Sequence, residues 1–200
     1  MKSVCLDLEG VLVPEIWINV AQKTGIEELK RTTRDEPDYN KLMKRRIELL
    51  DEHHLTLADI QAVIASMGPM EGAKEFLDEL RSLTQVLILS DTFVEFAKPL
   101  MAQLGWPTIF CNSLVVEDGR IIQHTMRQEE GKYHTILALK TLNISPFAAG
   151  DSYNDLKMIL EADGGCLFRA PEAIIETYPH LVMTNTYDEL MAQIKEFLGL

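Results

Sequence analysis

A small set of acidic and hydroxyl residues follows directly after short apolar runs of the sequence. Asp7 and Glu9 close the first run, Ser90 closes the second, and Asp151 and Asp155 flank the end of the third. Carboxylates two residues apart on an extended strand point the same way, so Asp7 and Glu9 are expected to face one site. With Asp151 converging on them, they would form the hard-oxygen site that Mg²⁺ prefers. A carboxylate can also attack phosphorus and form an aspartyl-phosphate, so these residue types suit phosphoryl transfer.

The apolar runs before these residues have the length and composition of buried parallel strands. They alternate with helix-like stretches and are Ser3–Leu8, Gln85–Leu89, Pro146–Ala149 and the weaker Gly164–Phe168. Helical spacing of apolar residues is clear at Phe76, Leu77, Leu80 and Leu83, and at Leu190, Met191, Ile194, Phe197 and Leu198. The pattern predicts an α/β protein with a Rossmann-like open parallel sheet. Ligands of such sheets bind beyond the carboxyl ends of the strands, where the polar residues lie.

One long segment interrupts this alternation. From Val11 to Met70 the sequence has no convincing strand, but it has several helical patterns. These cover Ile16–Thr24, Tyr39–His54 and Leu57–Ser66. We therefore predict a helical cap at residues 11–70, inserted after the first strand of an α/β core that comprises residues 1–10 and 71–200.

A shorter excursion from the alternation covers residues 112–126. Asp118 and Gly119 stand there between two runs rich in β-branched residues. An Asp-Gly pair in that setting is typical of a tight hairpin turn. We expect a small β-hairpin within the core.

The composition limits the classes of partner. The chain has 200 residues and a formal net charge of −12, with 46% hydrophobic and 25% charged residues, which is the balance of a globular protein. Such an acidic chain repels nucleic acid and anionic lipid, so neither nucleic acid nor a membrane is an expected partner. Positive charge for an anionic ligand must therefore be local, or come from a metal.

Targeting signals and disulfide patterns are not evident. The three cysteines are widely spaced with no CxxC pair, which favours reduced thiols. The N-terminus lacks a long apolar stretch, and no run approaches 18 apolar residues. We expect a soluble, cytoplasmic protein.

Four short motifs occur in the order and spacing of a known superfamily. They are Asp7-Leu8-Glu9-Gly10-Val11, Ser90-Asp91-Thr92, Lys132 and Gly150-Asp151-Ser152-Tyr153-Asn154-Asp155. Together they resemble the motifs of the haloacid dehalogenase (HAD) superfamily over essentially the whole chain. The helical cap and the hairpin resemble the phosphoserine phosphatase family within it. The motif strings also resemble the bifunctional subgroup that transfers phosphate from phosphoserine to homoserine.

The resemblance implies roles for the carboxylates. Asp7 would be the nucleophile and a Mg²⁺ ligand, and Asp151 would complete the metal site. Glu9 would act as general acid and then as general base, with its backbone carbonyl on the metal. Asp155 would orient the ligands from behind or cap the following helix. Glu9 stands where the family usually has Asp, and its extra methylene would leave room for an acceptor other than water.

The resemblance also implies the groups that bind the substrate. Ser90 would hydrogen-bond a phosphoryl oxygen, Lys132 would neutralise the charge of the transition state, and Asn154 would contact the substrate near its phosphate. In the cap, Glu15 and Arg46 resemble the pair that holds the ammonium and carboxylate of an amino acid. Asp91 belongs to the substrate-binding motif, but it replaces a family glycine, and we expect it mainly to cap the following helix.

Several alternatives stay open at the level of sequence. Arg45 could take the place of Arg46, because the phase of the helix is uncertain by one residue. Lys140 competes with Lys132, which we favour because it stands at the start of a helix. The expected activity is that of a Mg²⁺-dependent phosphoserine phosphatase with homoserine as a second acceptor. The sequence leaves open whether the protein forms a homodimer. The rival functions are hydrolysis of another small phosphomonoester and ligand binding without catalysis.

Overall fold

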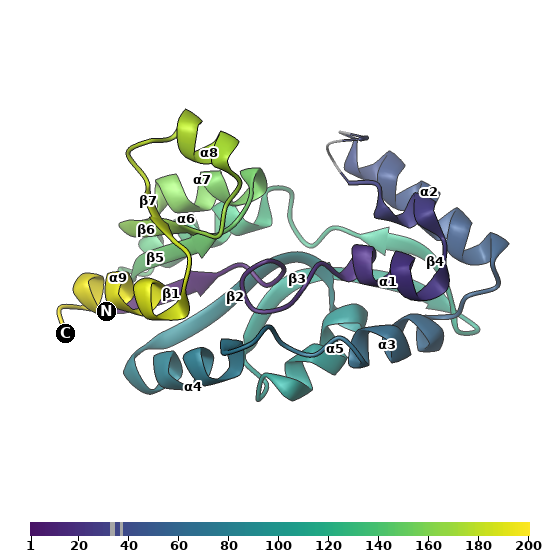
Figure 1. Cartoon of the computed structure of the whole chain (residues 1–200), viewed down its shortest axis with the longest axis horizontal. Helices are drawn as coiled ribbons and strands as arrows, with labels where there is room; N and C mark the ends of the chain where they lie inside the picture. Colours follow the sequence, from purple (N-terminus) through teal and green to yellow (C-terminus); the bar gives the residue numbers. More distant parts are fainter. Residues whose placement is uncertain (33–34, 37) are drawn as a thin grey trace.

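A central sheet organises the chain, and all its strands run parallel except the edge strand β4. The computed structural model describes residues 1–32, 35–36 and 38–200, and over these residues the strands form one seven-stranded sheet in the order β4-β3-β2-β1-β5-β6-β7. Strand β1 (Lys2–Leu6) lies at its centre, parallel to β2 (Gln85–Phe93) and β5 (Ser145–Gly150). The other strands are β3 (Thr108–Glu117), β4 (Arg120–Thr125), β6 (Gly164–Phe168) and β7 (Val182–Thr184). The predicted α/β class and open parallel sheet are confirmed (Figure 1).

Helices cover both faces of the sheet, and strand β1 shows why. Val4 and Leu6 belong to one buried hydrophobic cluster and Cys5 to another, because successive side chains of a strand point to opposite faces. The first cluster includes residues of α4 (Ala73–Leu83), α5 (Val94–Gln103) and α9 (Tyr187–Leu198). The second includes residues of α6 (Gly131–Thr141), α7 (Leu156–Glu161) and α8 (Glu172–Thr177). Burial on both faces explains why the strands are continuous apolar runs.

The segment after β1 is helical and lies beyond the carboxyl end of that strand (Figure 1). It contains α1 (Ile16–Thr24), the short 3₁₀ helix η1 (Glu27–Lys30), α2 (Tyr39–Glu52) and α3 (Leu57–Ala65). Helix α1 has the predicted bounds, and it ends at Gly25, whose φ of 74° suits only a residue without a Cβ. Helix α3 begins with a capping box formed by Thr56 and Asp59.

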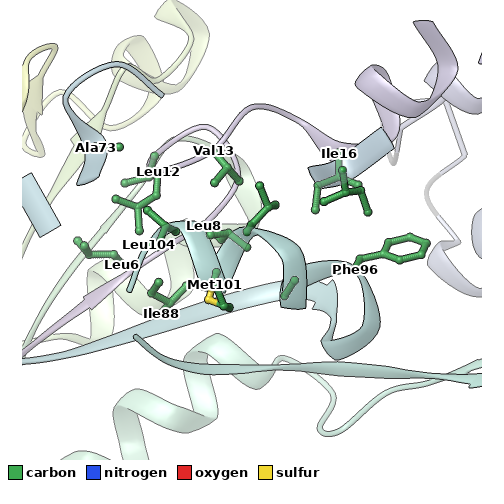
Figure 2. Packing of buried hydrophobic residues seen from close by; sticks show 14 of the residues in the cluster. Leu6, Leu8, Leu12, Val13, Ile16, Ala73, Ile88, Phe96, Met101 and Leu104 are labelled. Atoms are coloured by element: carbon green, nitrogen blue, oxygen red, sulfur yellow. The ribbon is translucent and has the colours of Figure 1, made fainter. Parts of the chain in front are cut away.

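The helical segment packs directly on the sheet core. Leu8, Leu12 and Val13, from the turn after β1, lie between strand residues and the first helix (Figure 2). Ile16 and Ile64 belong to the same buried cluster as the strands. The boundaries of a separate cap at residues 11–70 therefore stay a prediction.

The hairpin has the expected turn but a longer first strand. Asp118 and Gly119 both have positive φ, 49° and 79°, as the tight hairpin turn requires. Strand β3 begins at Thr108, before the predicted excursion, and its first residues pair in parallel with β2. This half of β3 and the three-residue strand β7 were not predicted, because each apolar run is only a few residues long.

No helix in the described part of the chain is long and apolar enough to cross a membrane. The longest there, α2, has 14 residues, whereas a span needs about 20.

Candidate active site

Three neighbouring strands deliver the predicted polar residues to one edge of the sheet. Asp7 follows β1, and its N–H donates to the carbonyl of Ala149 in β5 at 3.0 Å. Asp151 follows β5 directly. Ser90 lies in β2 at the point where the regular pairing with β3 stops. The order β2-β1-β5 therefore places these residues side by side.

Lys132 joins the carboxylates at the start of α6. It is only 5% exposed, and its Nζ donates to Asp7 Oδ1 at 2.8 Å and to Asp155 Oδ1 at 2.7 Å. Asp91 Oδ2 lies 3.8 Å from the same Nζ. Lys140, two turns further along the helix, instead pairs with Glu161 at the surface of the sheet's other end. The geometry therefore brings Lys132, and not Lys140, to the strand ends.

Asp155 organises the loop that carries Asp151. Its Oδ2 accepts hydrogen bonds from the backbone N–H of Asp151 and of Ser152, both at 3.1 Å, and from Ser152 Oγ at 3.0 Å. The Ser152 and Asp155 side chains form a capping box on a short 3₁₀ turn. Asp155 therefore holds Lys132 and the Asp151 loop in place, whereas the expectation that its side chain caps the following helix is wrong, because it makes no capping hydrogen bond to α7.

The carboxylates of Asp7, Asp151 and Asp155 are close enough to share a cation. One oxygen of each lies within 4.8 Å of the others. Burial, followed by the charge of Asp155, raises the pKa of Asp7 well above its usual value, and the same two causes raise the pKa of Asp151 to about 7. Burial alone would lower the pKa of Lys132, but Asp155 and Asp7 raise it well above its usual value, so the ammonium stays charged.

This charge balance fits a divalent cation. The carboxylates of Asp7, Asp151 and Asp155, when ionised, carry three negative charges, and the ammonium of Lys132 offsets one of them. Their oxygen atoms are the type of ligand that Mg²⁺ binds. Asp155 is engaged on both oxygens, whereas Asp7 uses Oδ1 for Lys132. Asp7 and Asp151 are therefore the side chains best placed to hold the ion.

Two glycines let these carboxylates sit against the backbone. A Cβ built on Gly10, whose φ is +78°, would overlap the carboxylate of Asp151. A Cβ on Gly150 would overlap the side chain of Asp155. Neither glycine can gain a side chain without displacing a member of the acidic cluster.

The Glu9 side chain lies within reach of the charge of Lys132 but is bonded to the start of α1. Strand β1 ends at Leu6, and the chain turns so that the carbonyl of Leu8 accepts from Leu12 and Val13. The expectation of an extended strand through Glu9 is therefore wrong. Its Oε2 instead accepts from the N–H of Ile16 at 2.8 Å, at the start of α1. Burial, and then the carboxylate of Glu15, raise the pKa of Glu9 to about 8.

Asp91 does not cap α5, so that expectation is wrong. Strand β2 continues to Phe93, which occupies the N-cap position of the helix without a side-chain hydrogen bond. Asp91 Oδ2 accepts instead from Asn154 Nδ2 at 2.9 Å. The buried Ser90 Oγ accepts from the N–H of Thr92 at 3.2 Å. The second and fourth motifs thus meet through the pair of Asp91 and Asn154.

The two arginines of α2 have opposite surroundings. Arg45 is half-buried and pairs with Glu28 and Glu52. Arg46 is 7% exposed, its guanidinium lies 4.6 Å from the Trp17 ring, and its Nη2 donates to the carbonyl of residue 31 at 2.7 Å. Its Nε is buried without a hydrogen-bond partner among the described residues.

Electrostatics place Arg46 beside the acidic residues of the turn and of α1. Burial lowers the pKa of Arg46 to about 10, whereas Tyr39, Glu9 and Glu15 act in the opposite direction. Glu15 is the exposed N-cap residue of α1 and makes no capping hydrogen bond. A buried guanidinium with an unsatisfied donor, next to an exposed carboxylate, can bind a ligand that carries both charges.

Two contacts around Asp91 had no signal in the sequence. The Tyr39 hydroxyl donates to the carbonyl of Asp91 at 3.2 Å, and Asn112 Nδ2 donates to the same oxygen at 3.0 Å. Burial raises the pKa of Tyr39. Tyr39 begins α2 and Asn112 lies in β3, so only the folded chain brings them to the second motif.

Known proteins resemble this chain over most of its length. Residues 1–163 match the family described as haloacid dehalogenase-like hydrolases. A Pseudomonas syringae pv. tomato protein named phosphoserine phosphatase is 55% identical over 199 residues, which cover 99% of this chain and 83% of that protein. A Pseudomonas aeruginosa protein named phosphoserine phosphatase ThrH is 54% identical over 199 residues, which cover 99% and 96%.

Solved structures share the fold. The apo form of a phosphoserine phosphatase superposes with a TM-score of 0.75 at 22% identity, covering 99% of this chain and 98% of that one. A phospho-aspartyl intermediate analogue of a phosphoserine phosphatase has a TM-score of 0.77 at 21% identity, covering 96% and 97%. At 21–22% sequence identity, these superpositions show a shared fold and nothing more.

Proposed function

Because the chain belongs to the haloacid dehalogenase-like hydrolase family, we propose that it hydrolyses phosphoserine by way of a phosphorylated Asp7. One observation carries the proposal, namely the buried contact between Lys132 and Asp7 at the sheet edge. Relatives that are 54–55% identical over 99% of the chain, and that are named phosphoserine phosphatases, support this choice of substrate.

In the first step, Asp7 attacks phosphorus in line, and the bond between phosphorus and the serine oxygen breaks. Glu9, with its pKa near 8, is protonated at neutral pH and gives its proton to the departing oxygen. Lys132 and Ser90 hold the phosphoryl oxygens, and the ammonium of Lys132 offsets their growing charge.

In the second step, a water molecule attacks the phosphorylated Asp7, and Glu9, now ionised, takes the proton of that water. The bond between phosphorus and the Asp7 oxygen breaks, so inorganic phosphate leaves and Asp7 is restored. Mg²⁺ held by Asp7, Asp151 and the backbone carbonyl of Glu9 would supply positive charge against the phosphate oxygens.

The amino-acid end of the substrate lies toward α1 and α2. Arg46 offers its guanidinium to the carboxylate, and its unpartnered Nε supports this role. Glu15, which is exposed and free of capping bonds, accepts the ammonium. Two opposite charges that act on each other favour an amino acid over a phosphomonoester that lacks them.

The finer part of the proposal is transfer to homoserine. Homoserine is serine with one more CH₂, so Glu15 and Arg46 can hold either alcohol. Glu9 is one methylene longer than the aspartate usual in the family, and this length would let it take a proton from an alcohol as well as from water. The phosphoryl group of Asp7 would then pass to the homoserine hydroxyl.

The test follows the phosphorus of labelled phosphoserine with Mg²⁺, with and without homoserine. We expect inorganic phosphate in both mixtures and phosphohomoserine only in the second. The Asp7→Asn variant is the control and should release neither product while keeping the wild-type melting temperature to within a few degrees. Intact phosphoserine in both mixtures rules out the proposed hydrolysis, and phosphate without phosphohomoserine rules out only the transfer.

Glu9→Asp separates the two acceptors. If the extra methylene admits the alcohol, the variant should yield more phosphate and less phosphohomoserine than the wild type at the same homoserine concentration. An unchanged product ratio would contradict this role of the side-chain length.

A further inference from the structure

The chain crosses between the sheet core and the helices α1–α3 through two adjacent segments. The first, residues 8–13, carries the chain out after β1, and the second, residues 67–73, brings it back into α4. They are joined by a hydrogen bond from the N–H of Met70 to the carbonyl of Leu12 at 2.9 Å. Each contains glycine at positive φ, Gly10 at 78° in the first and Gly72 at 80° in the second. Any change in the orientation of α1–α3 has to occur at these two segments.

One side chain from the far end of the sequence touches both segments. The hydroxyl of Tyr187, the first residue of α9, donates to the carbonyl of Val11 at 2.6 Å. The ring of the same tyrosine lies against Gly72, where an added Cβ would meet it at 3.3 Å. Burial raises the pKa of Tyr187 to about 12, so its hydroxyl remains a donor at physiological pH.

Tyr187 is itself held by the sheet core. Its ring stacks on Phe76 of α4, with centroids 4.9 Å apart, and on Phe168 of β6, with centroids 5.1 Å apart. The guanidinium of Arg169 lies 5.2 Å from the Tyr187 ring. A capping box of Thr186 and Glu189 fixes the start of α9. The hydroxyl therefore projects from a rigid support toward the first crossing segment.

The first crossing segment also carries groups of the site. Glu9 lies two residues and Gly10 one residue before Val11, and Gly10 is packed against the carboxylate of Asp151. At the other end of the turn, Glu9 is bonded to Ile16 at the start of α1. A shift of the Val11 carbonyl would move Glu9 and α1 together.

We propose that Tyr187 is a positioning residue that ties the two crossing segments to the sheet core and so sets how Glu9, Glu15 and Arg46 face the strand ends. The kinetic consequence rests on the proposed function, because only there do these three residues bind or protonate the substrate. The physical tie itself does not depend on which reaction the protein performs.

Tyr187→Phe tests the hydrogen bond to the Val11 carbonyl, because it removes the hydroxyl and keeps the stacked ring. Tyr178→Phe is the matched control, since Tyr178 is half-buried in the other hydrophobic cluster and its hydroxyl has no hydrogen-bond partner among the described residues. Amide hydrogen exchange is measured on the metal-free protein, and kcat and KM are measured for phosphoserine with Mg²⁺.

For Tyr187→Phe we expect exchange within residues 8–13 and 67–73 to rise roughly fivefold, the change that the net loss of one hydrogen bond produces. Exchange in β1 and β5 should stay at its wild-type rate. KM should rise by a similar factor, with a smaller change in kcat, because the amino-acid contacts depend on the orientation of α1 and α2. Tyr178→Phe should change none of these quantities.

Two results overturn the proposal. One is a variant whose exchange rises evenly over the whole chain, which is the signature of a merely structural tyrosine. The other is unchanged exchange in both crossing segments. If the wild-type protein does not hydrolyse phosphoserine, the proposed function fails, and the exchange pattern alone still decides the role of Tyr187.

Discussion

Replacing Lys132 by methionine is the sharpest perturbation of the site. Lys132 is buried, and its ammonium bridges Asp7 and Asp155 at 2.8 and 2.7 Å. Methionine has a similar length and fills the same space, so the change removes the charge and the hydrogen bonds without opening a large cavity. We expect phosphoserine turnover to be lost and the metal-free protein to be destabilised.

The expected size of the destabilisation follows from burial. Removing one partner of a buried ion pair leaves an uncompensated charge and costs about 3–5 kcal/mol. A domain of this kind is stable by about 5–15 kcal/mol, so the variant should still fold. The loss should shrink as pH falls, because the pKa of Asp7 is already raised and its carboxyl takes up a proton.

The measurement is urea unfolding in a chelator at two pH values. At pH 7.5 the midpoint of Lys132→Met should fall by about 1–2 M, and at pH 5.5 by clearly less. Lys140→Met is the matched control on the same helix. Its side chain is 35% exposed and pairs with Glu161 and Asp163, so it should cost at most about 1 kcal/mol.

Equal midpoints for the two variants would refute the reasoning, since they would mean that Lys132 does not compensate buried carboxylates. A loss at Lys132 that is the same at both pH values would contradict the part assigned to Asp7.

Other predictions concern the arginines, a glycine and the acidic cluster. Arg46→Ala should raise KM for phosphoserine roughly 30- to 150-fold, because about 2–3 kcal/mol of charged hydrogen bonding is lost. Arg45→Ala is the control and should change KM by less than twofold in steady-state kinetics. Similar increases in KM for both variants would mean that Arg46 does not bind the substrate. Gly10→Ala should cost about 1–2 kcal/mol through its positive φ and weaken Mg²⁺ binding in calorimetry by displacing Asp151, and unchanged Mg²⁺ affinity would count against that contact. The pKa of Asp151 is raised to about 7, so between about pH 4 and 7 the folded metal-free protein holds a proton there that the unfolded chain has released. The contribution of Asp151 to the free energy of unfolding of the metal-free protein therefore falls as pH rises from about 4 to 7. In a chelator, the melting temperature of Asp151→Asn should therefore rise relative to that of the wild type over that pH range, and Mg²⁺ should reverse this trend. A constant difference between the two melting temperatures across the range would refute the prediction.

Local sequence patterns were sufficient for the central strands and for the gathering of polar residues at their ends. Strand β6 and helix α1 have the predicted bounds, because apolar runs and a terminal glycine encode them within a few residues. The same holds for Asp7, Ser90 and Asp151, since chain position at a strand end decides where they lie once the strands are parallel and adjacent.

Where partners are distant along the chain, the patterns were insufficient. Asp91 was expected to cap the next helix, but Asn154, 63 residues away, donates to it. Glu9 was expected to lie on the extended strand with Asp7, but β1 ends at Leu6 and the Glu9 carboxylate accepts from Ile16. Both errors concern the end of a strand, because β1 stops at Leu6, before its apolar run does, and β2 continues to Phe93, beyond its apolar run.

The sequence by itself determined the α/β class, the helical segment after the first strand and the chemical types gathered at the strand ends. Only the tertiary structure decided which arginine is buried, which lysine meets Asp7 and that Tyr187 ties the two crossing segments together. Neighbouring positions on a helix differ by about 100° in direction, so composition and spacing do not separate Arg45 from Arg46. Packing against Trp17 distinguishes Arg46 from Arg45, because the burial of a side chain depends on the surfaces that surround it and not on the residue type alone.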